Sequence, residues 1–173
     1  MKKNGEIHMD IRLIEPSDAN VHLAFSQQLD NETSYMLMEP GERRPTAEQH
    51  QHMVNEFIMK DRLVLFIVED AGMVVGHVMG VGGSTIRNCR TASVVIGILP
   101  AYQRLGLGRR LLERIEAWAE KRGLHRLELT VIEENTGARA LYERFGFQIE
   151  GIKQDSLFAH GAYVNEIMMA KLL

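Results

Sequence analysis

The stretch from residue 92 to residue 122 constrains the fold most. Ala92 to Leu99 is a β-rich run that Pro100 stops. A long amphipathic pattern then covers about Leu107 to Arg122, and Gly123 is its natural C-terminal stop. The turn between them has glycine at positions 106 and 108. A strand that runs through a short glycine turn directly into a helix indicates a mixed α/β fold.

The rest of the chain continues this mixture of strand and helix patterns. We expect strands at residues 7–14, 63–68, 73–81, 92–99, 125–132, 147–153 and 163–171, and helices at residues 16–29, 46–58, 107–122 and 138–145. Residues 30–45, which include two prolines, indicate a loop or a broken helix. The predicted order is β-α-α-β-β-β-α-β-α-β-β. No linker divides it, so we expect one domain over residues 1–173.

Composition narrows the class of protein. With 173 residues, 45% of them apolar, the chain is long enough to bury a hydrophobic core without disulfide bonds or a structural metal. The single cysteine, Cys89, excludes an internal disulfide framework and a cysteine-based zinc site. A net charge of −3 argues against nucleic acid as a partner. No apolar run approaches the ~20 residues that span a bilayer, and no signal peptide is visible, so we expect a cytoplasmic protein without a membrane partner.

The glycine turn is a candidate phosphate site. A helix start presents unpaired backbone N–H groups at the positive end of the helix dipole, and glycine lets a ligand approach that backbone closely. Arg104, Arg109 and Arg110 add positive charge there. A plain helix start with a solvated arginine face is the alternative. Two nucleotide motifs are absent, because arginines follow Gly108 where a P-loop needs Lys-Ser/Thr, and Leu111 occupies the third glycine position of a Rossmann fingerprint.

Two longer motifs resemble the GCN5-related N-acetyltransferase (GNAT) family. Gln103-x-x-Gly106-x-Gly108, preceded by Ile96-Gly97-Ile98-x-Pro100, is similar to the family's Gln/Arg-x-x-Gly-x-Gly/Ala segment and the strand before it. Asn135-x-x-Ala138-x-Ala140-Leu141-Tyr142-x-x-x-Gly146-Phe147 resembles the second half of the family core, and Tyr163-Val164-Asn165-Glu166 its last strand. The resemblance covers about residues 60–171. Over the first 60 residues only the β-α-α order agrees.

The resemblance implies a partly splayed central sheet flanked by helices, with acetyl-CoA between the fourth and fifth strands. It further implies that the strand backbone pairs with the pantetheine arm, the glycine turn cradles the pyrophosphate and Asn135 contacts the cofactor from the other side. The cofactor-binding residues expected in this way are Ile96, Gly97, Ile98, Gln103, Arg104, Leu105, Gly106, Leu107, Gly108, Arg109, Asn135 and Tyr142. The family chemistry needs no metal.

The reaction implied is direct acyl transfer to an amine. A backbone N–H near Ile98 would stabilise an oxyanion, and Tyr142 matches the tyrosine that relatives use to protonate the leaving sulfur. The strand positions that carry the family's glutamate base look like Ala92 and Thr130, which cannot accept the proton. Glu128 is therefore the candidate base, with His77 and a chain of waters as alternatives.

We expect an acetyl-CoA-dependent N-acetyltransferase that acts on a primary amine of a small molecule or protein. A catalytically degenerate acyl-CoA-binding regulatory module is the alternative. A homodimer is common in the family and is one option here. Asp30, Glu32, Glu39 and Glu42 lie in the segment that the family places at the acceptor side, and they predict an acidic mouth that attracts a cationic amine. Arg43 and Arg44 partly cancel this charge, and a solvated loop is the alternative.

Overall fold

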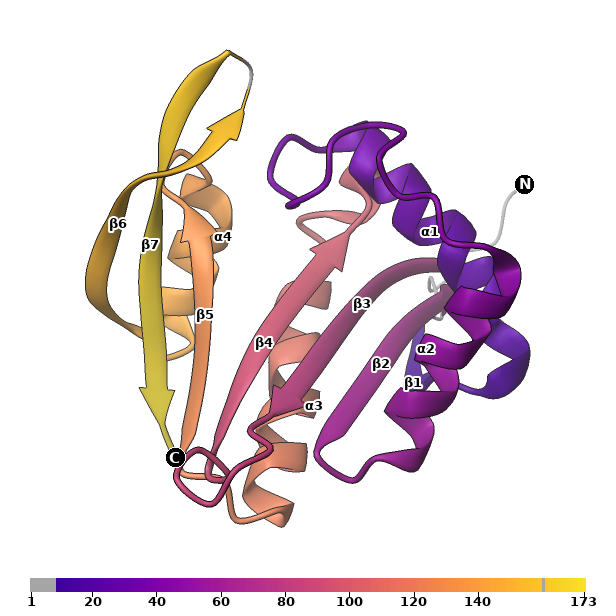
Figure 1. Ribbon diagram of the computed structural model, residues 1–173, viewed down its shortest axis with the longest axis horizontal. Coiled ribbons are helices and arrows are strands. Elements are labelled where there is room, and N and C mark those ends of the chain that lie inside the picture. The colour runs from indigo at the N-terminus through magenta and orange to yellow at the C-terminus, as the bar shows by residue number, and fades with distance from the viewer. Residues whose placement is uncertain (1–8, 160) are drawn as a thin grey trace, which may run out of the picture.

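Within the part of the chain that the structure describes, seven strands form one sheet in the order β1-β2-β3-β4-β5-β7-β6 (Figure 1). The computed structural model describes residues 9–159 and 161–173. The strands are β1 (Asp10–Leu13), β2 (Leu63–Asp70), β3 (Met73–Gly82), β4 (Thr91–Ile98), β5 (Arg126–Ile132), β6 (Gln148–Ala159) and β7 (Ala162–Leu172). The helices are α1 (Ala19–Glu32), α2 (Ala47–Met59), α3 (Leu107–Lys121) and α4 (Thr136–Arg144), with short 3₁₀ turns η1 (Pro16–Asp18) and η2 (Pro100–Tyr102). The predicted order of elements is confirmed.

The pairing of β4 with β5 determines where a ligand can enter the sheet. All other neighbouring strands run antiparallel, whereas β4 and β5 run parallel. Their register covers only Thr91–Ser93 of β4 against Arg126–Glu128 of β5. Beyond these residues the two strands diverge, as Figure 1 shows. The predicted splay is therefore confirmed, and it leaves backbone groups of β4 free to bond another molecule.

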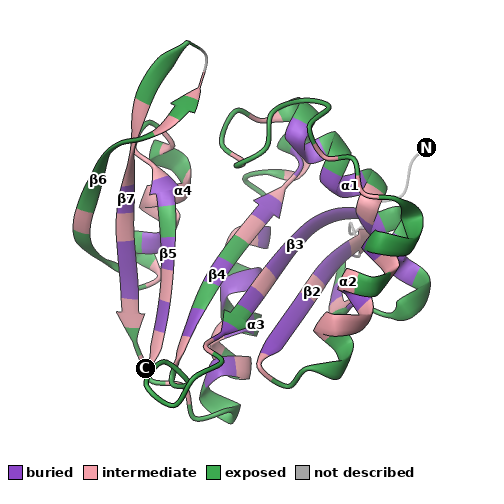
Figure 2. Ribbon diagram, in the orientation of Figure 1, coloured by how far each residue is buried: buried purple, intermediate pink, exposed green. Residues whose placement is uncertain are grey.

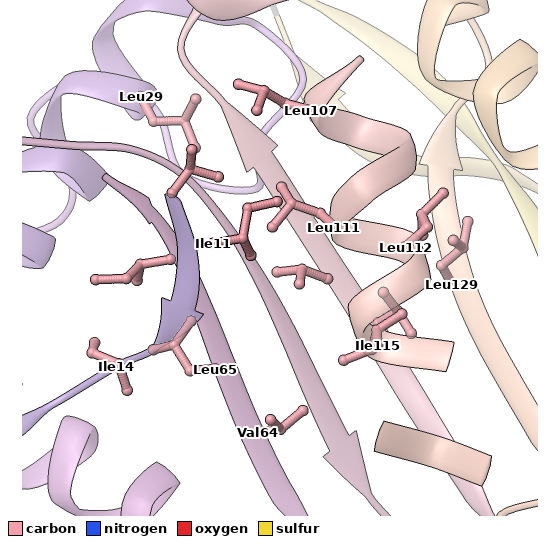
Figure 3. Close-up of a cluster of buried hydrophobic side chains, with 14 of the residues drawn as sticks. Ile11, Ile14, Leu29, Val64, Leu65, Leu107, Leu111, Leu112, Ile115 and Leu129 are labelled. Atoms are coloured by element: carbon pink, nitrogen blue, oxygen red, sulfur yellow. The ribbon is translucent and has the colours of Figure 1, made fainter. Parts of the chain in front are cut away.

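Helices cover both faces of the sheet. α1 and α2 pack on β3 and β2, and α3 packs on the other face against β2, β3 and β4 (Figures 1 and 2). Figure 3 shows Leu107, Leu111, Leu112 and Ile115 of α3 facing the strands, and all four are at most 1% exposed. Burying each such side chain contributes about 1.5–3 kcal/mol. No helix in the described ranges is both long and apolar enough to cross a bilayer.

Element ends differ from the predicted ones where polar contacts decide them. α1 continues past Leu29 because Asp30, only 1% exposed, is bound by Arg43 and packs as part of the buried face. α4 begins at Thr136 because Asn135 caps it. β6 extends to Ala159, beyond the predicted end at residue 153, although most of its residues are exposed and give no alternation to detect. Of the strand expected at 7–14, residues 7 and 8 lie outside the described residues.

Candidate active site

A cavity of about 1010 Å³ occupies the splay between β4 and β5. It is bounded by β4, the turn that leads into α3, β5, α4, the β6–β7 strands and the segment after α1. The lining contains most of the residues that the sequence singles out, namely Ile96, Gly97, Ile98, Gln103, Arg104, Gly106, Gly108, Arg109, Glu128, Asn135 and Tyr142. Leu105 and Leu107 do not line it with their side chains, since Leu105 faces solvent and Leu107 is buried in the core.

The turn before α3 has the backbone geometry of an anion cradle. Gln103 fixes its start by donating from Nε2 to the carbonyl oxygen of Ile98 at 3.3 Å. Arg104 and Gly106 then adopt positive φ angles of 61° and 78°. No N–H from Arg104 to Arg109 donates to a carbonyl of the described backbone. Because these donors gather at the positive end of α3, the turn can bind a diphosphate without any side-chain contact.

The two glycines of the turn serve different purposes. A Cβ on Gly106 would meet nothing within 4 Å, so its role is conformational: it begins α3 in the left-handed region that other residues avoid. A Cβ on Gly108 would lie 2.6 Å from Cδ2 of Leu141. Gly108 is therefore needed for the packing of α3 against α4, a reason that the sequence motif does not reveal.

Asn135 and Tyr142 approach the cavity from α4. Asn135 accepts the N–H of Ala138 through Oδ1 at 3.1 Å, which caps the helix and fixes the amide at the cavity wall. Tyr142 is 6% exposed, and its ring packs on Phe147 at 5.9 Å. Burial raises the pKa of the Tyr142 phenol above its ordinary value of about 10. The hydroxyl is consequently protonated at neutral pH, as a proton donor must be.

Glu128 lies at the vertex of the splay. It is opposite Ser93, the last paired residue of β4, and its carboxylate lines the cavity. Arg126 donates from Nε to Glu128 at 2.9 Å and binds Glu150 through its two other nitrogens. The two positions that resemble the family's base cannot serve, since Ala92 is 1% exposed and Thr130 carries a hydroxyl. Glu128 thus reaches the cavity, with one oxygen held by an arginine.

The cavity lining does not include the carboxylates of the acidic mouth predicted from residues 30–42. Asp30 is buried in an ion pair with Arg43, and none of the four carboxylates lines the cavity. That wall consists instead of Leu29, Thr33 and residues 35–37, a tyrosine, a methionine and a leucine. The sequence contains no signal for these side chains, because they follow the end of α1 in an irregular segment.

The sequence and fold of this chain have counterparts among known proteins. The model of the acetyltransferase (GNAT) family matches residues 28–147. The chain belongs to this GNAT family. Ribosomal protein bS18-alanine N-acetyltransferase from Escherichia coli K12 is 47% identical over 60 residues, which are 35% of this chain and 40% of that relative. The aligned segment thus spans less than half the length of this relative.

Two solved GNAT structures agree with the fold over nearly the whole chain. An acetyltransferase of the GNAT family from Streptococcus pneumoniae superposes with a TM-score of 0.91 at 28% identity, covering 96% of this chain and 99% of that one. Spermidine N-acetyltransferase from Vibrio cholerae, crystallised with CoA and spermine, superposes with a TM-score of 0.78 at 28% identity and 95% coverage of both chains. The family resemblance seen in the motifs therefore extends to the first 60 residues.

Proposed function

We propose that this protein transfers the acetyl group of acetyl-CoA to a primary amine of a small molecule or a protein. The observation that carries the proposal is the cavity in the splay, which joins the anion cradle of the turn to the protonated Tyr142. The Vibrio relative that binds CoA and spermine and the Escherichia coli relative that acetylates an alanine support an amine acceptor.

The residues present fit acetyl-CoA. The free N–H groups between Arg104 and Arg109 suit its diphosphate, and Arg104 and Arg109 line the cavity beside them. The unpaired edge of β4 at Ile96–Ile98 suits the amides of the pantetheine arm, which would bond it as an added strand would. When bound, acetyl-CoA supplies an activated thioester.

The chain's own groups then have separable tasks. The backbone N–H near Ile98 would donate to the carbonyl oxygen that becomes negative, and Tyr142 would hold the proton that the departing sulfur needs. A primary amine is protonated at neutral pH and must lose a proton before it attacks. Two groups are placed to accept it: Glu128 within the cavity, and His77, which lies behind Gly97.

The test combines binding with turnover. Acetyl-CoA at 100 times its dissociation constant should stabilise the fold by about 2.7 kcal/mol and raise the melting temperature by several degrees, whereas ATP should not. An amine panel of diamines, polyamines, amino acids and peptides with a free amino terminus is then scored by CoA thiol release. Thiol release with at least one amine supports the proposal. A melting shift with acetyl-CoA and no release with any amine would favour the regulatory module instead.

A further inference from the structure

Three buried histidines form a chain on the α1 side of the sheet. His50 of α2, His22 of α1 and His77 of β3 are 5%, 1% and 3% exposed. Nε2 of His50 lies 3.0 Å from Nδ1 of His22, and Nε2 of His22 lies 3.0 Å from Nδ1 of His77. Both distances are those of hydrogen bonds. The rings therefore connect three elements in one continuous line of donors and acceptors, which we call the histidine chain.

The inner end of the histidine chain faces the cavity wall. Nε2 of His77 is fully enclosed and is the one buried side-chain nitrogen or oxygen of the described residues that lacks a hydrogen-bond partner. It lies 3.2 Å from the point that a Cβ on Gly97 would occupy. Gly97 and Leu29, whose side chain closes over the same point, both line the cavity. A buried nitrogen without a hydrogen-bond partner destabilises the fold by about 1–3 kcal/mol. A cluster with a purely structural role would have no reason to keep such a nitrogen.

The outer end of the histidine chain reaches solvent. Within the described ranges no group bonds Nδ1 of His50, and this atom is not among the enclosed ones. The histidine chain thus runs from the back of Gly97, through the space between α1 and β3, to the surface of α2.

The charge state of the three rings suits proton transfer. Burial lowers the pKa of His22 to about 4 and lowers those of His50 and His77 as well. The positive charge of Arg43, which is paired with Asp30, lowers all three pKa values further. The negative charge of Asp18 acts in the opposite direction, and only at His22. Each ring is therefore neutral at pH 7, with one N–H and one lone pair. No group of three possible ligands converges on a metal position in the described part of the protein.

We propose that the histidine chain conducts the proton of the acceptor ammonium from the cavity to solvent, an inference that rests on the proposed function. The ammonium proton passes to Nε2 of His77, directly or through one water, as Leu29 turns aside. The Nδ1 proton of His77 moves to Nε2 of His22, the Nδ1 proton of His22 moves to Nε2 of His50, and Nδ1 of His50 releases its proton to water. Each ring stays neutral, and the opposite shift restores the tautomers once products leave and water reaches both ends.

This route differs from the one through Glu128. The Glu128 carboxylate is held by Arg126, which also holds Glu150, whereas Nε2 of His77 is unengaged. The backbone of Gly97 is the thinnest possible wall between His77 and the cavity, because any side chain there would contact the ring. Glycine at this position leaves the space beside His77 to Leu29, whose movement opens the route that the histidine chain needs.

The outer histidine offers the sharpest test because it is farthest from the cavity. His50→Gln retains an amide that can bond His22 but cannot pass a proton. We expect kcat to fall by about 10²-fold or more, as is typical when a proton-transfer group is lost, while KM for the amine and Kd for acetyl-CoA stay constant. His52→Gln, in the same helix but exposed, is the matched control and should behave as the parent. Glu128→Gln should lower kcat less than His50→Gln does.

A readout without turnover checks the histidine chain itself. With ring ¹⁵N labels, NMR should find Nδ1 of His77 protonated and Nε2 unprotonated, and His50→Gln should shift the His77 signals through His22 whereas His52→Gln should not. Two results would overturn proton conduction by the histidine chain without touching the proposed function. One is a folded His50→Gln protein with the parent's kcat between about pH 6 and 9, and the other is a set of His77 signals that the substitution leaves unchanged. A parent protein that releases no thiol with any amine overturns the proposed function, and with it the role of the histidine chain in proton transfer.

Discussion

Tyr142 is the residue whose environment best matches one chemical task. We expect Tyr142→Phe to lower kcat by about 10²-fold, because it removes the proton and keeps the packed ring. The Kd for acetyl-CoA and the melting temperature should change little, since the structure shows no hydrogen bond from this hydroxyl to the described residues. Steady-state kinetics and calorimetry measure both quantities.

Tyr102→Phe is the control for this prediction. Tyr102 bonds Asp70 through its hydroxyl at 2.8 Å and does not line the cavity, so its loss should leave kcat unchanged. A Tyr142→Phe protein with the parent's kcat, where chemistry limits the rate, would reduce Tyr142 to a packing role.

Gly108 lies where the start of α3 passes close to Leu141 of α4. In Gly108→Ala the new Cβ would crowd Leu141, so we expect a loss of about 1–3 kcal/mol in the free energy of unfolding. Leu141→Ala removes the crowded side chain, and the double variant should therefore be less unstable than the sum of the two single ones. Chemical denaturation of all four proteins gives the coupling. Strict additivity would mean that the clash is relieved elsewhere.

At the scale of elements, Asn135 combines a helix cap with a position on the cavity wall. Asn135→Ser keeps an oxygen that can cap α4 but loses the amide, so stability should be nearly retained while the Kd for acetyl-CoA rises. Asn135→Ala loses both, with about 1 kcal/mol of stability. Titration calorimetry and denaturation separate the two effects. If Ser and Ala variants bind acetyl-CoA as the parent does, Asn135 serves α4 alone.

Local patterns predicted most elements, and tertiary contacts determined what the patterns missed. The helix expected at residues 46–58 forms as α2, which a Thr46–Gln49 capping box starts, and the amphipathic run at 107–122 forms α3. The exposed outer half of β6 had no alternation to reveal it. The same limit applies to the site: the motifs predicted the turn and α4, but the histidine chain joins residues 28 and 55 positions apart, and only the packing of α1 and α2 on β3 brings them together.

At the scale of the whole molecule, the histidine chain links the stability of the fold to pH. The pKa of His22 is about 4 in the folded protein, against about 6.5 for an unperturbed histidine. Between these values the unfolded chain binds a proton that the folded one does not. The free energy of unfolding should therefore fall as pH drops from about 6.5 to 4, by about 3 kcal/mol from His22 alone, and should be constant above that range.

Urea denaturation at a series of pH values measures this slope. His22→Asn should reduce the slope, because it removes one buried side chain that stays unprotonated in the fold, while His50 and His77 still contribute. His52→Gln, at an exposed position of the same helix as His50, is the control and should retain the slope. Carboxylates that are paired in the fold lose their contribution to stability mainly below about pH 5. Arg12 lowers the pKa of Asp18, so the stability from that pair is retained above the ordinary carboxyl range and is lost only at lower pH. If the free energy of unfolding of the parent protein stays constant from about pH 6.5 to 5, the histidine chain takes up protons in the folded state. Histidine rings that are charged near neutral pH could not conduct the proton of the amine as neutral imidazoles do.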